Sequence, residues 1–307
     1  MIDDDLAGTK DVVGAIAELA ERFSGQLAVS AVDLSTGERV DWRPDVVMPT
    51  ASVIKEPILL ALLRAAEAGR LDLDTRVTLR ESERVGGSGV LKVFGGGLQP
   101  TVRDVATLMI NVSDNTATNK VLDLLGGPEP VNVAMAELGL NTIRLHNFVD
   151  FEVIGEDVRR LGEASVRELC ELGRLIATRQ AFSPTVSATA EEILSTQQYL
   201  DQAMRYTLAN PYARELGLAA PLTVASKTGF FTGTRVDAGI VRFGTGGGFT
   251  YAMANHEAAD TSFLPEAEGS VLNGLVGRLL VEHWWPADAG PPPVVPTAYE
   301  VLRQGAQ

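Results

Sequence analysis

Segments typical of β-strands occur near both ends of this 307-residue chain, with a long helical block between them. The segment LAVSAVDL, the turn STGE and the segment RVDW predict a β-hairpin. After Pro221 the segments LTVASKTG, DAGIVRF and GFTYAMAN have the β-rich composition of further strands, joined by glycine turns. Since all these strands need partners, we expect the two chain ends to complete one antiparallel sheet of about five strands, flanked by helices.

Apolar residues at a spacing of three to four predict the helices. The first is expected over 9–24, and a largely buried one begins near Thr50 and ends at Gly69. Further helices are expected over 101–115, 116–125, 129–138, 165–179, 189–195, 198–208 and 269–285. Residues 86–99 contain six glycines and predict a loop. The glycines of residues 244–248 lie between two strands, which predicts a hairpin turn rather than a phosphate-binding loop.

The composition excludes several classes of partner. With 45% hydrophobic residues the chain can bury a large core, whereas its net charge of −14 leaves no basic surface for nucleic acid or an anionic membrane. The segment MIDDDLAGTKDVVGAIAELA lacks the basic region and the apolar run of a secretion signal, and no apolar run is long enough to span a membrane. We therefore expect a cytoplasmic protein, or a secreted one if a leader was removed.

Cysteine and histidine residues predict no cofactor site. The single cysteine, Cys170, cannot form an intrachain disulfide, and the helical spacing of its apolar neighbours predicts a core residue rather than a nucleophile. His146, His256 and His283 are scattered, without the spacing of metal ligands. We expect neither a metal nor another cofactor, and no feature of the sequence predicts the oligomeric state.

Three short motifs with chemically active side chains occur in order: Ser52-Val53-Ile54-Lys55, Ser113-Asp114-Asn115 and Lys227-Thr228-Gly229. A serine hydroxyl is a weak nucleophile, and a lysine three positions later on a helix lies on the same face and can take its proton. Lys55 must be neutral to act as the base for Ser52, and both burial and a nearby Lys227 would lower its pKa. Because the chain has only five lysines, chance is a poor explanation of the three motifs together.

The second motif predicts proton relay and hydrogen bonding. Ser113 is expected to relay a proton to the leaving group, and Asn115 to hold either the Lys55 amine or the substrate amide. The backbone N–H groups of Ser52 and Phe230 are the expected donors of an oxyanion hole, one at a helix N-terminus and one on a strand.

The third motif predicts recognition of a carboxylate. Lys227 and Thr228, on a strand edge, are expected to bind this group, with Arg235 as a second cation. The expected partner is therefore a small-molecule substrate that carries a carboxylate.

The three motifs in this order resemble those of class A β-lactamases, within the β-lactamase and penicillin-binding-protein superfamily of serine hydrolases. The resemblance extends to SGVL, LMINVSDNTATN and KTGFFTGTRVDAGIV and covers about residues 9–285. It implies a two-lobe fold with the active site in the cleft. The α/β lobe would comprise residues 1–47 and 203–288, the all-α lobe residues 48–202, and a Pro-rich tail residues 289–307.

The chain departs from this family in one segment. Class A enzymes carry a Glu-X-X-Leu-Asn motif on an omega loop about 36 residues after the Ser-Asp-Asn serine, where the glutamate activates the deacylating water. Here the corresponding residues 145–152 read LHNFVDFE. We expect Asp150, with Glu152 as the alternative, to replace the glutamate. An aspartate is one methylene shorter, so we expect slow deacylation and slow β-lactam turnover.

The sequence therefore predicts a serine hydrolase of β-lactamase type, which acylates Ser52 with a lactam, amide or ester and hydrolyses the acyl-enzyme. One alternative is an esterase, D-amino-acid peptidase or biosynthetic acyltransferase of the same fold. Another is a non-catalytic binding protein that retains the fold, although such a protein has no need of the Ser52–Lys55 pair. The loops 84–99 and 146–163 are expected to determine which substrate is bound.

Overall fold

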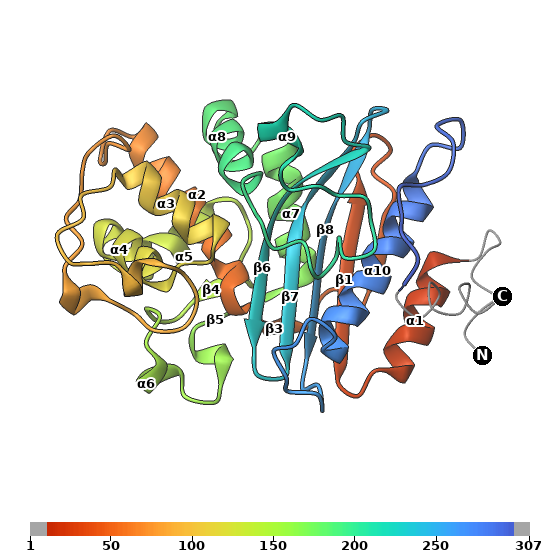
Figure 1. Ribbon diagram of the computed structural model, residues 1–307, viewed down its shortest axis with the longest axis horizontal. Coiled ribbons are helices and arrows are strands. Elements are labelled where there is room, and N and C mark those ends of the chain that lie inside the picture. The colour runs from red at the N-terminus through yellow and green to blue at the C-terminus, as the bar shows by residue number, and fades with distance from the viewer. Residues whose placement is uncertain (1–10, 298–307) are drawn as a thin grey trace.

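One five-stranded antiparallel sheet forms the centre of the molecule (Figure 1). The computed structural model describes residues 11–297. The strands are β1 (Gln26–Asp33), β2 (Arg39–Trp42), β6 (Leu222–Phe231), β7 (Thr234–Phe243) and β8 (Gly248–His256), in the order β2-β1-β8-β7-β6. The two chain ends meet where β1 pairs with β8, with Ala28 opposite Ala254. The sheet predicted from the sequence is therefore confirmed.

Helices cover both faces of the sheet (Figure 1). Helices α1 (Val12–Arg22) and α10 (Glu268–Trp284) pack on one face, and α7 (Val166–Ala177) packs on the other. Successive residues of a strand point to opposite faces. Leu27 accordingly packs into the core beneath α1 and α10, whereas Ala28 packs into the core shared with the helical lobe. Because both faces are buried, the strands are apolar over most of their length.

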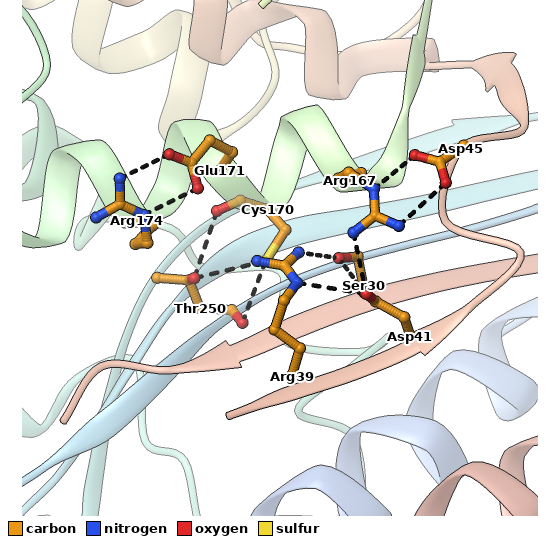
Figure 2. Close-up of polar contacts among 9 residues, drawn as sticks. All are labelled: Ser30, Arg39, Asp41, Asp45, Arg167, Cys170, Glu171, Arg174 and Thr250. Carbon is orange, nitrogen blue, oxygen red and sulfur yellow. Dashed lines mark hydrogen bonds and ion pairs between the residues drawn. The ribbon is translucent and has the colours of Figure 1, made fainter. Parts of the chain in front are cut away.

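Polar side chains reinforce the contact between α7 and the sheet, as Figure 2 shows. The Arg167 guanidinium donates to Asp41 on β2 and to both carboxylate oxygens of Asp45. Cys170 is completely buried beside Thr250, with its Sγ 3.5 Å from the Thr250 carbonyl oxygen. Burial raises the pKa of the Cys170 thiol to about 11, which disfavours the reactive thiolate. The prediction of a core cysteine is confirmed.

The helical lobe is inserted between β2 and β6. The segment between β2 and β6 contains α7 and the helices α2 (Lys55–Glu67), α3 (Val102–Asn111), α4 (Asn115–Leu125), α5 (Glu129–Glu137), α6 (Phe151–Ile154), α8 (Pro184–Leu194) and α9 (Ala213–Leu216), with 3-10 turns η1 (Ala51–Ile54), η2 (Glu81–Glu83), η3 (Leu91–Val93) and η4 (Val158–Arg160). Helix α2 lies inside this lobe and is almost entirely buried, as its apolar sequence predicts. None of the described helices is long and apolar enough to cross a lipid bilayer.

A second, small sheet lies in the segment predicted to be an all-α lobe. Strands β3 (Val47–Pro49), β5 (Gly162–Ser165) and β4 (Arg144–Leu145) pair in that order, so the expectation of an entirely helical lobe over 48–202 is wrong. Segments of two to four residues are too short to show the alternation by which strands are predicted.

Two predicted helices also differ from the structure. The helix expected over 101–115 ends at Asn111, because Ser113 adopts a left-handed φ of 54° and the Asp114 carboxylate caps α4 by accepting from the Ala117 N–H. The segment 198–208 contains no helix. There, the Gln202 side chain and the Ala203 N–H bond to β6 and β7, and the local bonds, such as Arg205 N–H to the Gln202 carbonyl, form only turns. Burial rather than helix formation therefore accounts for its apolar residues.

The first part of the proline-rich tail returns to the protein. The Leu208 N–H donates to the Pro293 carbonyl at 2.8 Å, and the Val295 N–H donates to the Tyr206 carbonyl at 2.9 Å. Part of the predicted Pro-rich tail therefore packs against the protein. The remainder of the predicted tail, 298–307, and the first ten residues lie outside the described residues.

Candidate active site

Ser52 lies in a strained turn at the start of the buried helix α2. The residue before it, Ala51, has a left-handed φ of 43°, a conformation that costs a non-glycine residue roughly 1–3 kcal/mol. Strand β6 passes beside this turn. A Cβ atom at Gly229 would lie 2.9 Å from the Thr50 carbonyl oxygen and 3.1 Å from the Ser52 nitrogen, so only glycine permits this approach. The first and third motifs are thereby brought together.

Lys55 is completely buried and contacts the second motif. Its Nζ lies 2.7 Å from the Ser113 carbonyl oxygen, 3.0 Å from Ser113 Oγ and 2.9 Å from Asn115 Oδ1. Burial lowers the pKa of Lys55 well below its usual value, and the positive charge of Lys227 lowers it further. A neutral amine has two N–H bonds and a lone pair, so the Ser113 hydroxyl would then donate to Nζ. The contact between Lys55 Nζ and Ser113 Oγ can therefore transfer a proton from either group to the other.

The Ser113-Asp114-Asn115 turn is held by the glycine-rich loop. The Asp114 carboxylate accepts from the N–H groups of Val90 and Leu91, at 2.6 and 2.8 Å. Gly89 has a φ of 98°, and a Cβ there would lie 2.3 Å from the Asp114 carboxylate. The loop must therefore be free of side chains at this point, which explains part of its glycine content.

Ser88, in the same loop, is a site residue that the sequence analysis did not predict. Its hydroxyl donates to the Ser113 carbonyl oxygen at 2.6 Å, the same oxygen that Lys55 contacts. The Asn115 amide donates to the Gly86 carbonyl at 2.8 Å. The one feature of the sequence that could have indicated Ser88 is its position between Gly87 and Gly89.

A cavity of about 480 Å³ opens at Ser52. It is lined by Ala51, Ser52, Gly87, Ser88, Ser113, Asn115, Val149, Phe151, Ile154, Val158, Leu161, Tyr199, Asp201, Phe230, Phe231, Thr232 and Phe263. The lining includes both loops expected to determine the substrate, 84–99 and 146–163. Ser52 and Phe230, whose N–H groups are the expected oxyanion donors, face the same space, as that role requires.

The structure does not place Asp150 in this cavity. Its side chain is exposed at the N-terminus of α6, where Oδ1 accepts from the N–H groups of Glu152 and Val153 at 2.9 and 3.4 Å. Glu152 is also exposed and absent from the lining. An aspartate before a short helix is satisfied by capping it, and this turn directs the apolar Phe151 and Ile154 to the cavity instead. The predicted deacylation base is therefore not supported.

None of the residues expected to bind a carboxylate lines the cavity. Lys227 is completely buried and its Nζ donates to the Thr228 carbonyl at 2.7 Å. Thr228 is buried as well, and its Oγ1 has no hydrogen-bond partner among the described residues. Burial lowers the pKa of Lys227 to about 7, although the nearby Glu56 and Asp237 raise it. Lys227 therefore belongs to a buried group of charges that also includes Glu56 and Asp237.

Arg235 has a structural role in place of the predicted contact with substrate. It is buried, and its guanidinium donates to the carbonyl oxygens of Phe231, Thr234 and Ser262 and to the Ser270 hydroxyl. Its Cζ lies 5.3 Å from the ring centres of both Phe230 and Phe263. With four of its five N–H donors occupied, Arg235 supports two aromatic walls of the cavity.

Comparison with known sequences identifies the family. A sequence model of the β-lactamase enzyme family matches residues 11–284. The chain belongs to this family. It is 32% identical over 123 residues to β-lactamase L2 of Stenotrophomonas maltophilia, 40% of each chain. It is 32% identical over 132 residues to β-lactamase SME-1 of Serratia marcescens, 42% of this chain and 44% of that one. The chain thus spans less than half the length of these curated relatives.

Solved structures extend the family likeness over the whole fold. A β-lactamase from Sphaerobacter thermophilus has a TM-score of 0.78 at 26% identity and covers 89% of this chain and 96% of its own. The structure of PBP-A has a TM-score of 0.74 at 28% identity, with 88% and 94% covered. The two-lobe β-lactamase-like fold predicted from the sequence is confirmed.

Proposed function

We propose that this chain is a serine acyl hydrolase of the β-lactamase type, in which Ser52 is acylated readily and the acyl-enzyme is hydrolysed slowly. The observation that carries the proposal is the buried Lys55 amine, in contact with Ser113 and Asn115 at a cavity that exposes Ser52. The apolar residues that line the same cavity support the second part of the proposal, slow hydrolysis of the acyl-enzyme.

The positions of these side chains support the following acylation step. The Ser52 hydroxyl oxygen attacks the substrate carbonyl carbon, and its proton passes to the neutral Lys55 amine. The N–H groups of Ser52 and Phe230 stabilise the resulting oxyanion. When the C–N bond of a lactam or amide breaks, the Ser113 hydroxyl gives its proton to the leaving nitrogen and regains one from Lys55. Every proton that leaves Ser52 is thereby returned to the leaving group.

Deacylation lacks an equivalent arrangement. Water must attack the acyl-serine, and in class A enzymes a loop glutamate activates that water. Here the corresponding loop contributes Val149, Phe151, Ile154, Val158 and Leu161 to the cavity, and both of its candidate acids are exposed outside it. A variant of PBP-A was solved as an acyl-enzyme complex with penicillin G. That relative supports an adduct of the same kind in this chain.

Stopped-flow measurement with a chromogenic cephalosporin tests the proposal. We expect a burst of about one equivalent, followed by slow turnover. Intact-mass spectrometry during the slow phase should show one acyl group, which peptide mapping locates on Ser52. Ser52→Ala is the control and should give neither burst nor adduct. Burst-free turnover at hundreds per second, or label on another residue, would contradict the proposal.

An esterase of the same fold is the second candidate, and the charge of the cavity favours it. No lysine, arginine or histidine is present among the described residues that line the cavity. Uncharged esters need no such cation, and their better leaving groups reduce the demand on proton transfer. Turnover of a neutral ester much faster than that of any penicillin would favour this candidate.

A further inference from the structure

Large apolar and aromatic side chains dominate the lining of the cavity at Ser52. They are Val149, Phe151, Ile154, Val158 and Leu161 from the loop 146–163, together with Tyr199, Phe230, Phe231 and Phe263. The second motif contributes Ser113 and Asn115 to the same lining. Pockets for small molecules have this composition, in which apolar contacts provide affinity and a few polar groups fix the orientation of the ligand. The lining therefore offers apolar surface to a part of the substrate other than the reacting bond.

Phe151, Tyr199 and Phe263 are aromatic lining residues that remain exposed to water. Their exposed fractions are 44%, 40% and 66%, whereas Ile154 and Val158 are buried. Single exposed apolar residues are common on protein surfaces, but several around one cavity indicate a binding surface. An apolar group of the substrate would remove these rings from water, which favours binding in proportion to the area covered.

Phe151 connects this apolar surface to the catalytic groups. A Cβ atom at Gly87 would lie 3.0 Å from Phe151 Cζ and 2.7 Å from Asn115 Nδ2. The tip of the ring and the Asn115 amide therefore lie against the same glycine. Asn115 in turn contacts the Lys55 amine at 2.9 Å. The Phe151 ring thus lies beside the groups that act on the acyl carbonyl.

The backbone on the N-terminal side of Phe151 is fixed by side-chain hydrogen bonds. The Asn119 amide donates to the Val149 carbonyl at 3.0 Å, and Asn119 Oδ1 accepts from the Val149 N–H at 2.8 Å. The Asp150 carboxylate caps the short helix that begins at Phe151. A residue that selects a substrate must be held in this way, because a loosely held side chain adapts to many groups.

We propose that Phe151 determines which acyl group the site accepts. Its ring packs against the acyl chain of the substrate, so that the enzyme selects acyl donors whose acyl group is an apolar chain of several carbons. With the carbonyl carbon at Ser52, such a chain lies across the ring. The inference rests on the proposed acylation of Ser52 and specifies the acyl group of its substrate. It places no condition on the leaving group or on its charge.

Three p-nitrophenyl esters with the same leaving group test this selectivity: the acetate, the butyrate and the hexanoate. We expect the second-order rate of acylation of Ser52 to rise about three- to fourfold with each added methylene group, the gain expected when that group is buried. The rate with hexanoate should therefore exceed the rate with acetate about a hundredfold. Phe151→Ala should lower this hexanoate-to-acetate ratio about tenfold, because the chain loses its contact with the ring.

Two further variants provide the controls. Phe151→Leu keeps an apolar side chain at this position and should retain most of the hexanoate-to-acetate ratio. Phe94→Ala removes a phenylalanine of similar exposure, 46%, that does not line the cavity, and its ratio should equal that of the wild type. A purely structural defect would slow all three esters equally. A wild-type rate that does not rise with chain length, or an equal ratio in wild type and Phe151→Ala, overturns the inference.

Equilibrium binding separates this inference from the proposed function. N-phenyl-1-naphthylamine is a neutral, apolar fluorophore that cannot acylate serine. In a fluorescence titration we expect it to bind Ser52→Ala, and to bind about tenfold more weakly when Phe151→Ala is added. Adding Phe94→Ala instead should leave its affinity unchanged.

The outcomes of this titration and of the ester series distinguish the two ideas. Equal affinity with and without Phe151→Ala, or no binding of the fluorophore at all, overturns the role of Phe151 whether or not Ser52 is acylated. Failure of all three esters to label Ser52, with fluorophore binding that still depends on Phe151, refutes only the proposed acylation and supports the apolar site.

Discussion

Burial determines the chemistry of the Lys55 side chain. An exposed lysine is protonated at neutral pH and cannot accept a proton from serine. Inside the protein, desolvation and the charge of Lys227 both favour the neutral amine. The contacts to Ser113 and Asn115 then fix the direction of its nitrogen. A short helical motif thus becomes a base only in the folded protein.

Removing Lys55 should therefore cost more than removing Lys227. With an uncharged ester such as p-nitrophenyl acetate, we expect Lys55→Ala to lower the acylation rate by about 10² to 10⁴, the usual contribution of a general base. Lys227→Ala should lower it less than about tenfold, because Lys227 does not line the cavity. A larger loss in Lys227→Ala would require the two roles to be exchanged.

The pH profile of Lys227→Ala gives an independent readout. Lys227 lowers the pKa of Lys55 through its positive charge. Without it, the protonated form of Lys55 becomes easier to form, so the pKa of Lys55 rises. The acidic limb of the pH–rate profile for acylation should move to higher pH. A limb that does not move, or that moves to lower pH, would show that the two lysines are not coupled.

At the scale of the elements, the site depends on how closely β6 approaches the turn before α2. The approach is possible because Gly229 has no side chain, and it places Phe230 at the cavity beside Ser52. The Ser113 turn contributes the third part, held in place by the caps and the loop around Asp114. Three elements from different parts of the chain must therefore keep their spacing for the site to act.

Gly229→Ala should slow acylation of Ser52. The added Cβ would meet backbone atoms of Thr50 and Ser52, so β6 or the turn must move by several tenths of an ångström. We expect about a hundredfold slower acylation, since displacements of up to 1 Å have effects of that size. Gly95→Ala is a matched control, because a Cβ there meets nothing within 4 Å. Acylation rates of Gly229→Ala within twofold of wild type would refute the role assigned to this contact.

At the scale of the whole molecule, charged side chains are buried where the lobes meet. Glu56 on α2, Lys227 on β6 and Asp237 on β7 are almost completely buried. The Tyr251 hydroxyl donates to Asp237 at 3.1 Å, and the Ala203 N–H donates to its other oxygen. Burial nevertheless raises the pKa of Asp237 to about 8. The protonation of this carboxyl therefore links the stability of the fold to pH.

Asp237→Asn should change how stability depends on pH. Between the ordinary aspartate pKa of 3.8 and about 8, the folded protein holds a proton that the unfolded chain has released. The stability contributed by Asp237 is thus present at low pH and lost as pH rises through about 8. The unfolding free energy of wild type minus that of Asp237→Asn should fall from pH 5 to pH 8, by at most about 1.4 kcal/mol per unit.

Urea unfolding at several pH values measures this difference. The variant also removes a negative charge that raises the pKa of Lys227. With a lower pKa, Lys227 makes the variant gain stability as pH rises over the same range, which acts in the same direction. A difference that is constant or that rises with pH would mean that Asp237 is ionised throughout.

The sequence by itself determined the sheet, most helices and the three motifs. The spacing of apolar residues along a helix or strand reflects which of its faces are buried. This spacing predicts the element from the local sequence wherever the element is long enough. The helical spacing of Ser52 and Lys55 likewise fixes their relation before any tertiary contact forms. The core position of Cys170 follows from the same local pattern.

Only the tertiary structure decided which side chains reach the cavity. Asp150 caps α6, Arg235 donates to three carbonyl groups, and Lys227 is buried. The sequence motifs had predicted that all three side chains face the substrate. Asp201 lines the cavity from a segment predicted to be a helix. A side chain's direction depends on the hydrogen bonds and close contacts offered by distant segments, and local sequence patterns carry no record of those partners.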